Sequence, residues 1–181
     1  GVGRLLVASA FLIFSISLIP GLFGAPLGEI DAYVPAASGS YFGGGAAANG
    51  GLVWLKNDYK NALATARAEN KLVLVTFTGY ACTNCHWMKA NMFTRPEIAS
   101  VMKNFVLVEL YTDGEDDASR INQDVEEKKF GTVAIPFYAV IDPDEKVIAS
   151  FPGRTTSTQE FLAFLNTGSK VAQVFAPADA R

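Results

Sequence analysis

The sequence contains very little cysteine and histidine, with two cysteines and one histidine among its 181 residues. Two cysteines cannot build a multi-disulfide scaffold. Together with the single histidine they also fall short of a closed four-ligand zinc site, unless a carboxylate or a partner contributes, so we expect no metal. The chain also lacks a cluster of lysines and arginines, and its formal net charge is −3. Without a basic stripe to follow a phosphate backbone, a nucleic-acid partner is not expected.

A long segment near the N-terminus lacks charge. Segment 5–24 is uncharged and apolar, and as a helix of about 20 residues it would span roughly 30 Å, the thickness of a bilayer core. Arg4 precedes this segment and acidic residues follow from Glu29, a distribution that places the N-terminus in the cytoplasm and the rest outside. We therefore predict a transmembrane helix within residues 1–24.

Two other interpretations of this segment remain open. Small residues at Gly24 and Ala25 would suit a cleaved signal peptide, although the apolar run is longer than a usual signal core. A buried globular helix would be interrupted at Pro20. Because the chain begins at Gly1 rather than at a methionine, we interpret the span as the last one of a larger membrane domain.

Composition divides the rest of the chain into three parts. Residues 25–51 are rich in alanine, glycine, serine and proline and have too little apolar content for a core, which predicts a flexible linker. This linker could let a mobile domain reach its partners, or it could be a spacer without a task. Residues 52–167 read as a globular domain, and the tail 168–181 shows no strong pattern.

Hydrophobic periodicity within the globular domain predicts alternating helices and buried strands. Helices are expected over residues 58–70, from 96 onward, over 118–129, and from a cap at 157 or 158 to 166; strands are expected over 72–78, 105–111, 137–141 and 147–151. From the first strand onward the order is β-α-β-α-β-β-α, which indicates an α/β sandwich on a mixed sheet.

Both cysteines lie in one motif, Cys82-x-x-Cys85, between a predicted strand at 71–77 and a segment at 87–93 that can continue as a helix. Amide N–H groups at a helix N-terminus stabilise a thiolate on the first sulfur, and the thiolate is the form that attacks disulfides. Cys85 lies one turn further on, where it can resolve the resulting mixed disulfide. We therefore predict redox exchange, with Cys82 as the nucleophile and Cys85 as the resolving thiol.

On these residues the chain resembles the thioredoxin superfamily. More narrowly, it resembles the periplasmic C-terminal domain of DsbD-type transmembrane thiol:disulfide reductases, also called cytochrome c biogenesis reductases. The resemblance covers about residues 52–166 and rests on three matching segments, 71–85, 95–98 and 134–137. It implies a thioredoxin-like mixed sheet flanked by helices. It also implies a cis proline at Pro136 that faces the dithiol and, with Ile135, shapes a groove for a partner's extended chain; the alternative is an ordinary proline at the start of a strand.

The resemblance also implies a route for electrons. They would pass from cytosolic thioredoxin through a membrane domain, of the same or a partner protein, to the two cysteines and then to extracytoplasmic disulfide-containing proteins. The expected location is the inner (cell) membrane, with the thioredoxin-like domain facing the periplasm or extracytoplasmic space. No cofactor is expected beyond the redox-active disulfide.

Three positions depart from the family pattern. Ala81 stands where many thioredoxins have tryptophan, and Tyr80 just before it is the candidate partner-facing aromatic. Thr76 replaces a buried aspartate that assists proton transfer in relatives, and Lys89 replaces a common glutamate. Thr76 and Lys89 are therefore candidates for tuning the pKa values of the thiols.

Proton transfer from the second thiol thus lacks an evident acceptor. Asn84, His86 or a water molecule could substitute for the missing aspartate, and the sequence does not choose among them. His86 is also a candidate for pKa tuning of the thiols, because histidine titrates near neutral pH.

Two further functions fit the same residues. The motif with His86 also spells Cys-x-x-Cys-His, the attachment pattern of c-type haem, in which His86 would ligate iron together with Met88, Met92 or Met102. The strand before the motif and the Ile-Pro pair argue against that interpretation. A non-catalytic binding module is the other alternative, but binding alone needs no second thiol.

Overall fold

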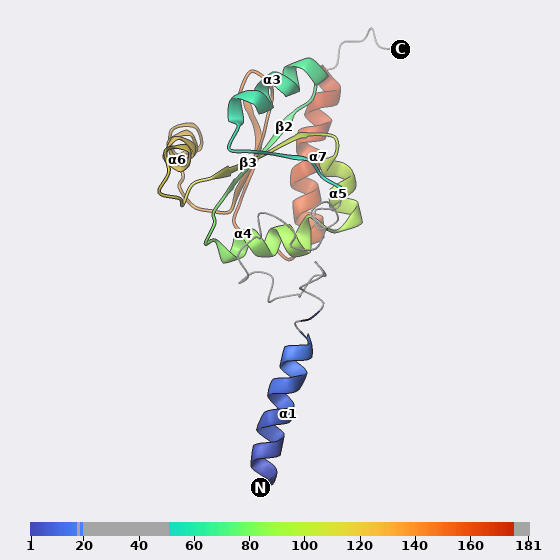
Figure 1. Cartoon of the computed structure of the whole chain (residues 1–181). Helices are drawn as coiled ribbons and strands as arrows, with labels where there is room; N and C mark the ends of the chain where they lie inside the picture. Colours follow the sequence, from blue (N-terminus) through green and yellow to red (C-terminus); the bar gives the residue numbers. More distant parts are fainter. Residues whose placement is uncertain (18, 20–50, 176–181) are drawn as a thin grey trace.

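The computed structural model describes residues 1–17, 19 and 51–175, and it contains one mixed β-sheet in the order β1-β3-β2-β4-β5 (Figure 1). Strands β1, β3 and β2 are parallel, β4 is antiparallel to β2, and β5 is antiparallel to β4. The strands are β1 (Trp54–Lys56), β2 (Val73–Thr78), β3 (Val106–Tyr111), β4 (Phe137–Ile141) and β5 (Val147–Pro152). Nearly all of the predicted linker and the last six residues of the tail lie outside the described residues.

Helices cover both faces of this sheet (Figure 1). Helices α3 (Tyr59–Glu69) and α6 (Asp117–Phe130) pack on one face, over an apolar core that includes Val75, Phe77 and Val108. The other face carries a short helix, a π-helical turn and two further helices: α4 (Thr83–Trp87), η2 (Met88–Met92), α5 (Pro96–Met102) and α7 (Thr158–Phe175). We call the second side the thiol face and the first the opposite face. This arrangement confirms the predicted α/β fold on a mixed sheet.

Helix starts follow the capping residues of the sequence. The side chain of Asp58 accepts a hydrogen bond from the Asn61 amide at 3.1 Å at the start of α3. Asp116 does the same for Ser119 at 2.8 Å at the start of α6, and this hydrogen bond lowers the pKa of Asp116. Ser157 caps α7 by accepting a hydrogen bond from the Glu160 amide at 3.3 Å, in agreement with the predicted cap at 157 or 158.

Two elements differ from the sequence prediction. Strand β1 was not predicted, because three residues are too short to show a period of two, and pairing with β3 is what defines it. Helix α7 was predicted to end at residue 166 but continues to Phe175. A glycine at 168 suggests a helix end by composition, yet Gly168 serves close packing here, since a Cβ atom there would lie 2.6 Å from Cγ1 of Val140.

The N-terminal helix α1 spans Val2–Ser17 and has no buried residue. Its exposed side chains include many large apolar ones, among them Leu5, Phe11 and Ile13. Among the described residues, no helix is long and apolar enough to cross a membrane. The predicted transmembrane helix extends to residue 24, and residues 18 and 20–24 of that segment lie outside the described part of the chain.

Candidate active site

The two cysteines form a disulfide where β2 passes into α4, with their Cα atoms 5.3 Å apart. Cys82 is the N-cap residue of α4, and the Cys85 amide donates a hydrogen bond to its sulfur at 3.2 Å. Cys82 is partly exposed, whereas Cys85 is only 2% exposed. A partner can therefore reach the outer sulfur, and the amide that contacts this sulfur favours its thiolate once the disulfide is reduced.

The loop before Cys82 is fixed by two side chains. The Asp113 carboxylate accepts hydrogen bonds from the Tyr80 amide at 2.7 Å and from the Ala81 amide at 2.9 Å. His86 donates from Nε2 to the Tyr80 carbonyl at 2.9 Å. The peptide groups directly before the nucleophile are thus held from two sides, while the Tyr80 and Ala81 side chains stay exposed.

The Ile135–Pro136 peptide bond is cis, as the resemblance predicts, and it immediately precedes β4. Pro136 is buried and Ile135 is half-buried. At Gly79, the last residue before the thiol loop, a Cβ atom would lie 2.7 Å from Cδ1 of Ile135 and 2.4 Å from Oδ2 of Asp113. The structure therefore brings Ile135 and the Asp113 side chain together at the base of the loop that leads to Cys82.

A polar cluster lies on the thiol face of the sheet. Lys89 on η2 pairs with Glu109 on β3, Nζ to Oε2 at 2.5 Å, and donates to the Tyr111 hydroxyl at 3.1 Å. Thr76 and Thr78 on β2 are buried, and neither hydroxyl has a hydrogen-bond partner within the described residues. Thr76 and Lys89 therefore both lie in or beside this cluster, and their effect on the thiols stays a prediction.

Two tyrosines and a lysine form the flank of the site. The Tyr80 and Tyr111 rings stack with centroids 4.2 Å apart. The Lys56 ammonium lies 4.4 Å from the Tyr111 centroid and 5.1 Å from that of Tyr80, a distance at which a cation is attracted to an aromatic face. Tyr80 remains 46% exposed and is available to a partner beside the sulfur.

Sequence reasoning missed four residues of this site: Asp113, Glu109, Tyr111 and Lys56. Asp113 was visible only as part of an acidic loop, because its contact with the Tyr80 amide joins residues 33 positions apart. Glu109 did leave a signal, since it is the only charged residue in an otherwise apolar predicted strand. A lone charge in a buried strand needs a partner.

The geometry does not suit haem. His86 is engaged with the Tyr80 carbonyl, and all three methionines that could complete the iron coordination, Met88, Met92 and Met102, are fully buried in the core of the thiol face. Within the described ranges, no group of three or more histidine, cysteine or acidic side chains could hold a metal ion.

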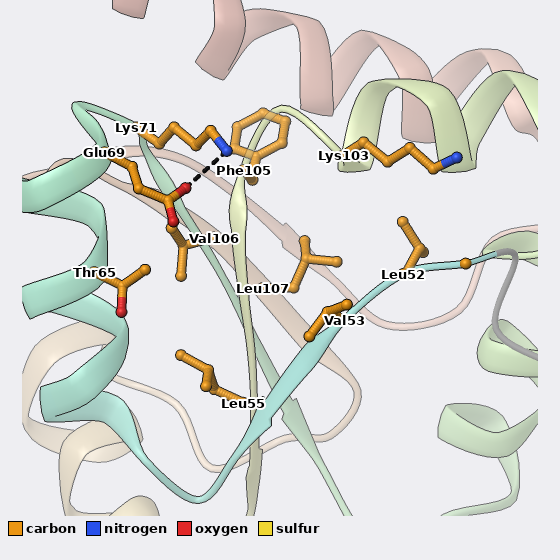
Figure 2. A pocket seen from close by; sticks show the side chains of 11 residues that line it. Leu52, Val53, Leu55, Thr65, Glu69, Lys71, Lys103, Phe105, Val106 and Leu107 are labelled. Atoms are coloured by element: carbon orange, nitrogen blue, oxygen red, sulfur yellow. Dashed lines mark ion pairs between the residues drawn. The ribbon is translucent and has the colours of Figure 1, made fainter. Parts of the chain in front are cut away.

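A pocket of about 290 Å³ opens at the far end of the sheet from the thiols (Figure 2). It lies between the start of β1, α3 and the start of β3, and Figure 2 shows the Glu69–Lys71 ion pair of 2.8 Å at its edge. None of the predicted site residues lines it. The disulfide therefore lies outside this cavity, at the loop that precedes α4.

A thioredoxin-like family model matches residues 53–143, half of the chain. The chain belongs to the thioredoxin-like family. No curated protein matches it.

Solved structures of thioredoxin-like proteins share the fold at low sequence identity. A DsbH oxidoreductase is 18% identical with a TM-score of 0.56, over 75% of this chain and 96% of that one. A putative disulphide-isomerase from Bacteroides thetaiotaomicron is 20% identical with a TM-score of 0.53, over 66% and 93%. The DsbD C-terminal domain of Neisseria meningitidis, in the reduced form, is 21% identical with a TM-score of 0.50, over 63% and 99%. At these identities the likeness is one of fold.

Proposed function

We propose that this thioredoxin-like protein is a thiol:disulfide oxidoreductase that reduces disulfides of extracytoplasmic proteins. The observation that supports this best is the asymmetry of the pair: Cys82 is accessible and its sulfur accepts an amide hydrogen bond, whereas Cys85 is buried behind it. A structural disulfide would gain nothing from an exposed, amide-stabilised sulfur. A nucleophile needs both features.

The reaction runs in two steps from the reduced protein. The Cys82 thiolate attacks one sulfur of the partner's disulfide, forms a mixed disulfide and releases the partner's other sulfur as a thiolate. Cys85 then loses its proton and attacks Cys82, which restores the Cys82–Cys85 disulfide and releases the partner's second thiolate. Two electrons have passed to the partner, and no cofactor is required.

The partner's chain would lie across the exposed surface beside the thiols. Tyr80 and Ala81 form one side of this groove, and Ile135 and Pro136 form the other. Tyr80 is well exposed, and its backbone is already fixed by Asp113 and His86, so it can contact a partner at little entropic cost. This open geometry suits a protein substrate better than a small molecule.

Two substitutions test the function. Cys82→Ser should abolish reduction of a protein disulfide, whereas Cys85→Ser should accumulate mixed disulfides, because nothing resolves them. A Cys82→Ser protein that keeps its activity would refute the assigned roles. A redox titration then gives the direction of net electron flow: a reduction potential of about −270 mV indicates a reductant, and one of about −120 mV indicates an oxidant.

We also propose that the chain is anchored in the inner (cell) membrane and receives its electrons from a membrane domain, as DsbD-type reductases would. The uncharged segment 5–24 and the exposed apolar side chains of α1 support this proposal. The full chain should then stay with membranes after an alkaline wash, and a membrane-impermeant maleimide should label Cys82 in intact cells after outer-membrane permeabilisation. A protein released by the wash, or labelled only after lysis, would contradict this location.

A further inference from the structure

The buried thiol must lose a proton before it can resolve the mixed disulfide. Cys85 is 2% exposed, so bulk water has little access to its sulfur. Attack on Cys82 requires the Cys85 S–H bond to break, and a base positioned nearby speeds such a step by orders of magnitude. The strand position before the motif holds Thr76, whose hydroxyl is not a base at neutral pH.

Four other polar residues are poor candidates for that base, each for its own reason. His86 uses Nε2 to donate to the Tyr80 carbonyl, and Asn84 carries an amide, which is not basic. Asp113 binds two loop amides at the surface. Glu126 belongs to α6, on the opposite face of the sheet.

Glu109 lies on the thiol face of the sheet. Strands β2 and β3 run parallel with Thr76 directly opposite Glu109. Side chains alternate along each strand, so Thr76 and Glu109 share the face that carries Leu74 and Leu107. These two leucines belong to the same core cluster as Met88, at the C-terminal end of α4. The Glu109 side chain therefore lies on the face of the sheet that the cysteine-bearing helix covers.

Lys89 connects this carboxylate to the cysteine helix. It follows Cys85 by four residues and so lies about one turn further along the same side of the helix. Its ammonium contacts Glu109 Oε2 at 2.5 Å, and the two side chains are 24% and 15% exposed. The ion pair thus ties the carboxylate to a residue one turn beyond the inner thiol.

We propose, building on the function proposed above, that Glu109 accepts the proton of Cys85 during the resolving step and that Lys89 positions its carboxylate. The Cys85 S–H bond breaks, its proton passes to Glu109, and the sulfur forms a bond to Cys82 while the Cys82–partner bond breaks. The partner's sulfur takes that electron pair and leaves as a thiolate. The Thr76 hydroxyl, buried and unpaired beside Glu109, can relay the proton.

The groups that face Glu109 come from three strands and the helix. Lys89 approaches from η2 and Tyr111 lies two residues along β3. Thr76 lies opposite on β2, and Lys56 lies opposite on β1. The Lys56 ammonium is placed over the Tyr111 ring, and Lys89 is the lysine paired with Glu109.

An aryl disulfide that releases a coloured thiolate separates the two steps. With reduced full-length protein in stopped flow, the first equivalent of colour reports attack by Cys82 and the second reports resolution by Cys85. In Glu109→Gln, attack should be unchanged and resolution should slow at least about tenfold at neutral pH. The slowed step should also lose the part of its pH dependence that stems from the carboxylate.

Two further variants show whether the carboxylate or the ion pair matters. Lys89→Met removes the positioning cation but keeps the base, so it should slow resolution, though clearly less than Glu109→Gln does. Thr76→Asp combined with Glu109→Gln returns a carboxylate to the facing position and should recover the resolving rate. Equal slowing in Lys89→Met and Glu109→Gln would show that only the ion pair matters and overturn the proposal, as would a double variant that stays slow.

The same assay distinguishes this inference from the function on which it rests. If reduced wild-type protein releases no first equivalent, the oxidoreductase function itself fails. If wild type releases both equivalents and Glu109→Gln resolves at the same rate across the pH range, only the role of Glu109 is refuted.

Discussion

Each face of the central sheet carries one glutamate removed from bulk water, and the two are accommodated in opposite ways. On the thiol face, Glu109 pairs with Lys89 and lies close to the Tyr111 hydroxyl, at 3.4 Å. On the opposite face, Glu126 is fully buried, and neither of its oxygens has a hydrogen-bond partner among the described residues. Burial raises the pKa of Glu126 to about 8.

The two glutamates differ because, within the described part of the chain, only Glu109 has a cation within contact distance. An acid without a partner stays buried only in its neutral form, because desolvation penalises the charge. Glu126 is therefore largely protonated at neutral pH, whereas Glu109 has a cation within contact distance. The thiol face thus pairs its glutamate with a cation, and the opposite face holds its glutamate as a neutral side chain.

The largest expected effect comes from removing the acid of the opposite face. Between about pH 4.5 and 8 the unfolded glutamate ionises while the folded one stays protonated, so wild-type stability should fall as pH rises through this window. Glu126→Gln cannot titrate. The difference in unfolding free energy between variant and wild type should therefore grow by about 3 kcal/mol from pH 4.5 to pH 7.

Urea unfolding at several pH values measures this difference. Glu127→Gln, at the exposed neighbouring position, is the matched control and should follow wild type throughout. If the unfolding free energies of wild type and Glu126→Gln change with pH in the same way, the pKa of Glu126 is not raised by burial.

Breaking the ion pair on the thiol face should lower the unfolding free energy, and by less than Glu126→Gln raises it. Lys89→Met leaves Glu109 without its cation, which should cost about 1–2 kcal/mol of unfolding free energy, because both side chains are only partly desolvated. Adding Glu109→Gln should recover part of that loss. A double-mutant cycle in urea gives the coupling energy, and a coupling near zero would mean that the pair does not stabilise this face.

Removing the Asp113 carboxylate should affect rate more than stability. Asp113→Ala removes the acceptor of the Tyr80 and Ala81 amides. If the lost hydrogen bonds raise the barrier to attack by about 1 kcal/mol, the attack rate should be about fivefold lower. Glu115→Ala removes a charge from the same loop and should leave the rate unchanged. If both variants slow attack equally, loop charge rather than the two hydrogen bonds sets the rate.

The smallest effect is expected at the unpaired hydroxyls. Thr78→Val replaces an orphaned buried hydroxyl by a methyl group and should stabilise the protein by about 0.5 kcal/mol or leave it unchanged. Thr112→Val removes a hydroxyl that donates to the Thr78 carbonyl at 3.4 Å and should destabilise it. Thermal unfolding of the two variants side by side compares them, and a loss of stability in Thr78→Val would reveal a partner for its hydroxyl.

Much of the fold was predictable because it depends on local patterns. Periodicity located the four longer strands and the helices around them, and the Asp142–Lys146 segment forms the turn between the last two strands, with Glu145 at a φ of +66°. Strand β1 and the continuation of α7 past Gly168 were not predictable, since each depends on contacts with distant strands.

The candidate site shows the same division. Cys82, Cys85 and Pro136 carry local motifs and could be named from the sequence. Glu109 could not be placed there, because its relation to the thiols depends on the register between β2 and β3 and on a lysine 20 residues away. Resemblance to the family points to position 76 for the proton acceptor, whereas the acid that we propose for this role lies on the neighbouring strand.

The crowding at Gly79 has a consequence for how the site senses a partner. With a hydrogen in place of a side chain there, the Asp113 carboxylate and Ile135 both come within reach of a single backbone position. Ile135 belongs to the proposed groove, and Asp113 holds the amides directly before the nucleophile. Under the proposed function, a partner chain that moved Ile135 toward Gly79 would crowd Asp113 as well, and Asp113 binds the amides next to Cys82. Gly79, which has no side chain, would then couple binding in the groove to the backbone of the nucleophile.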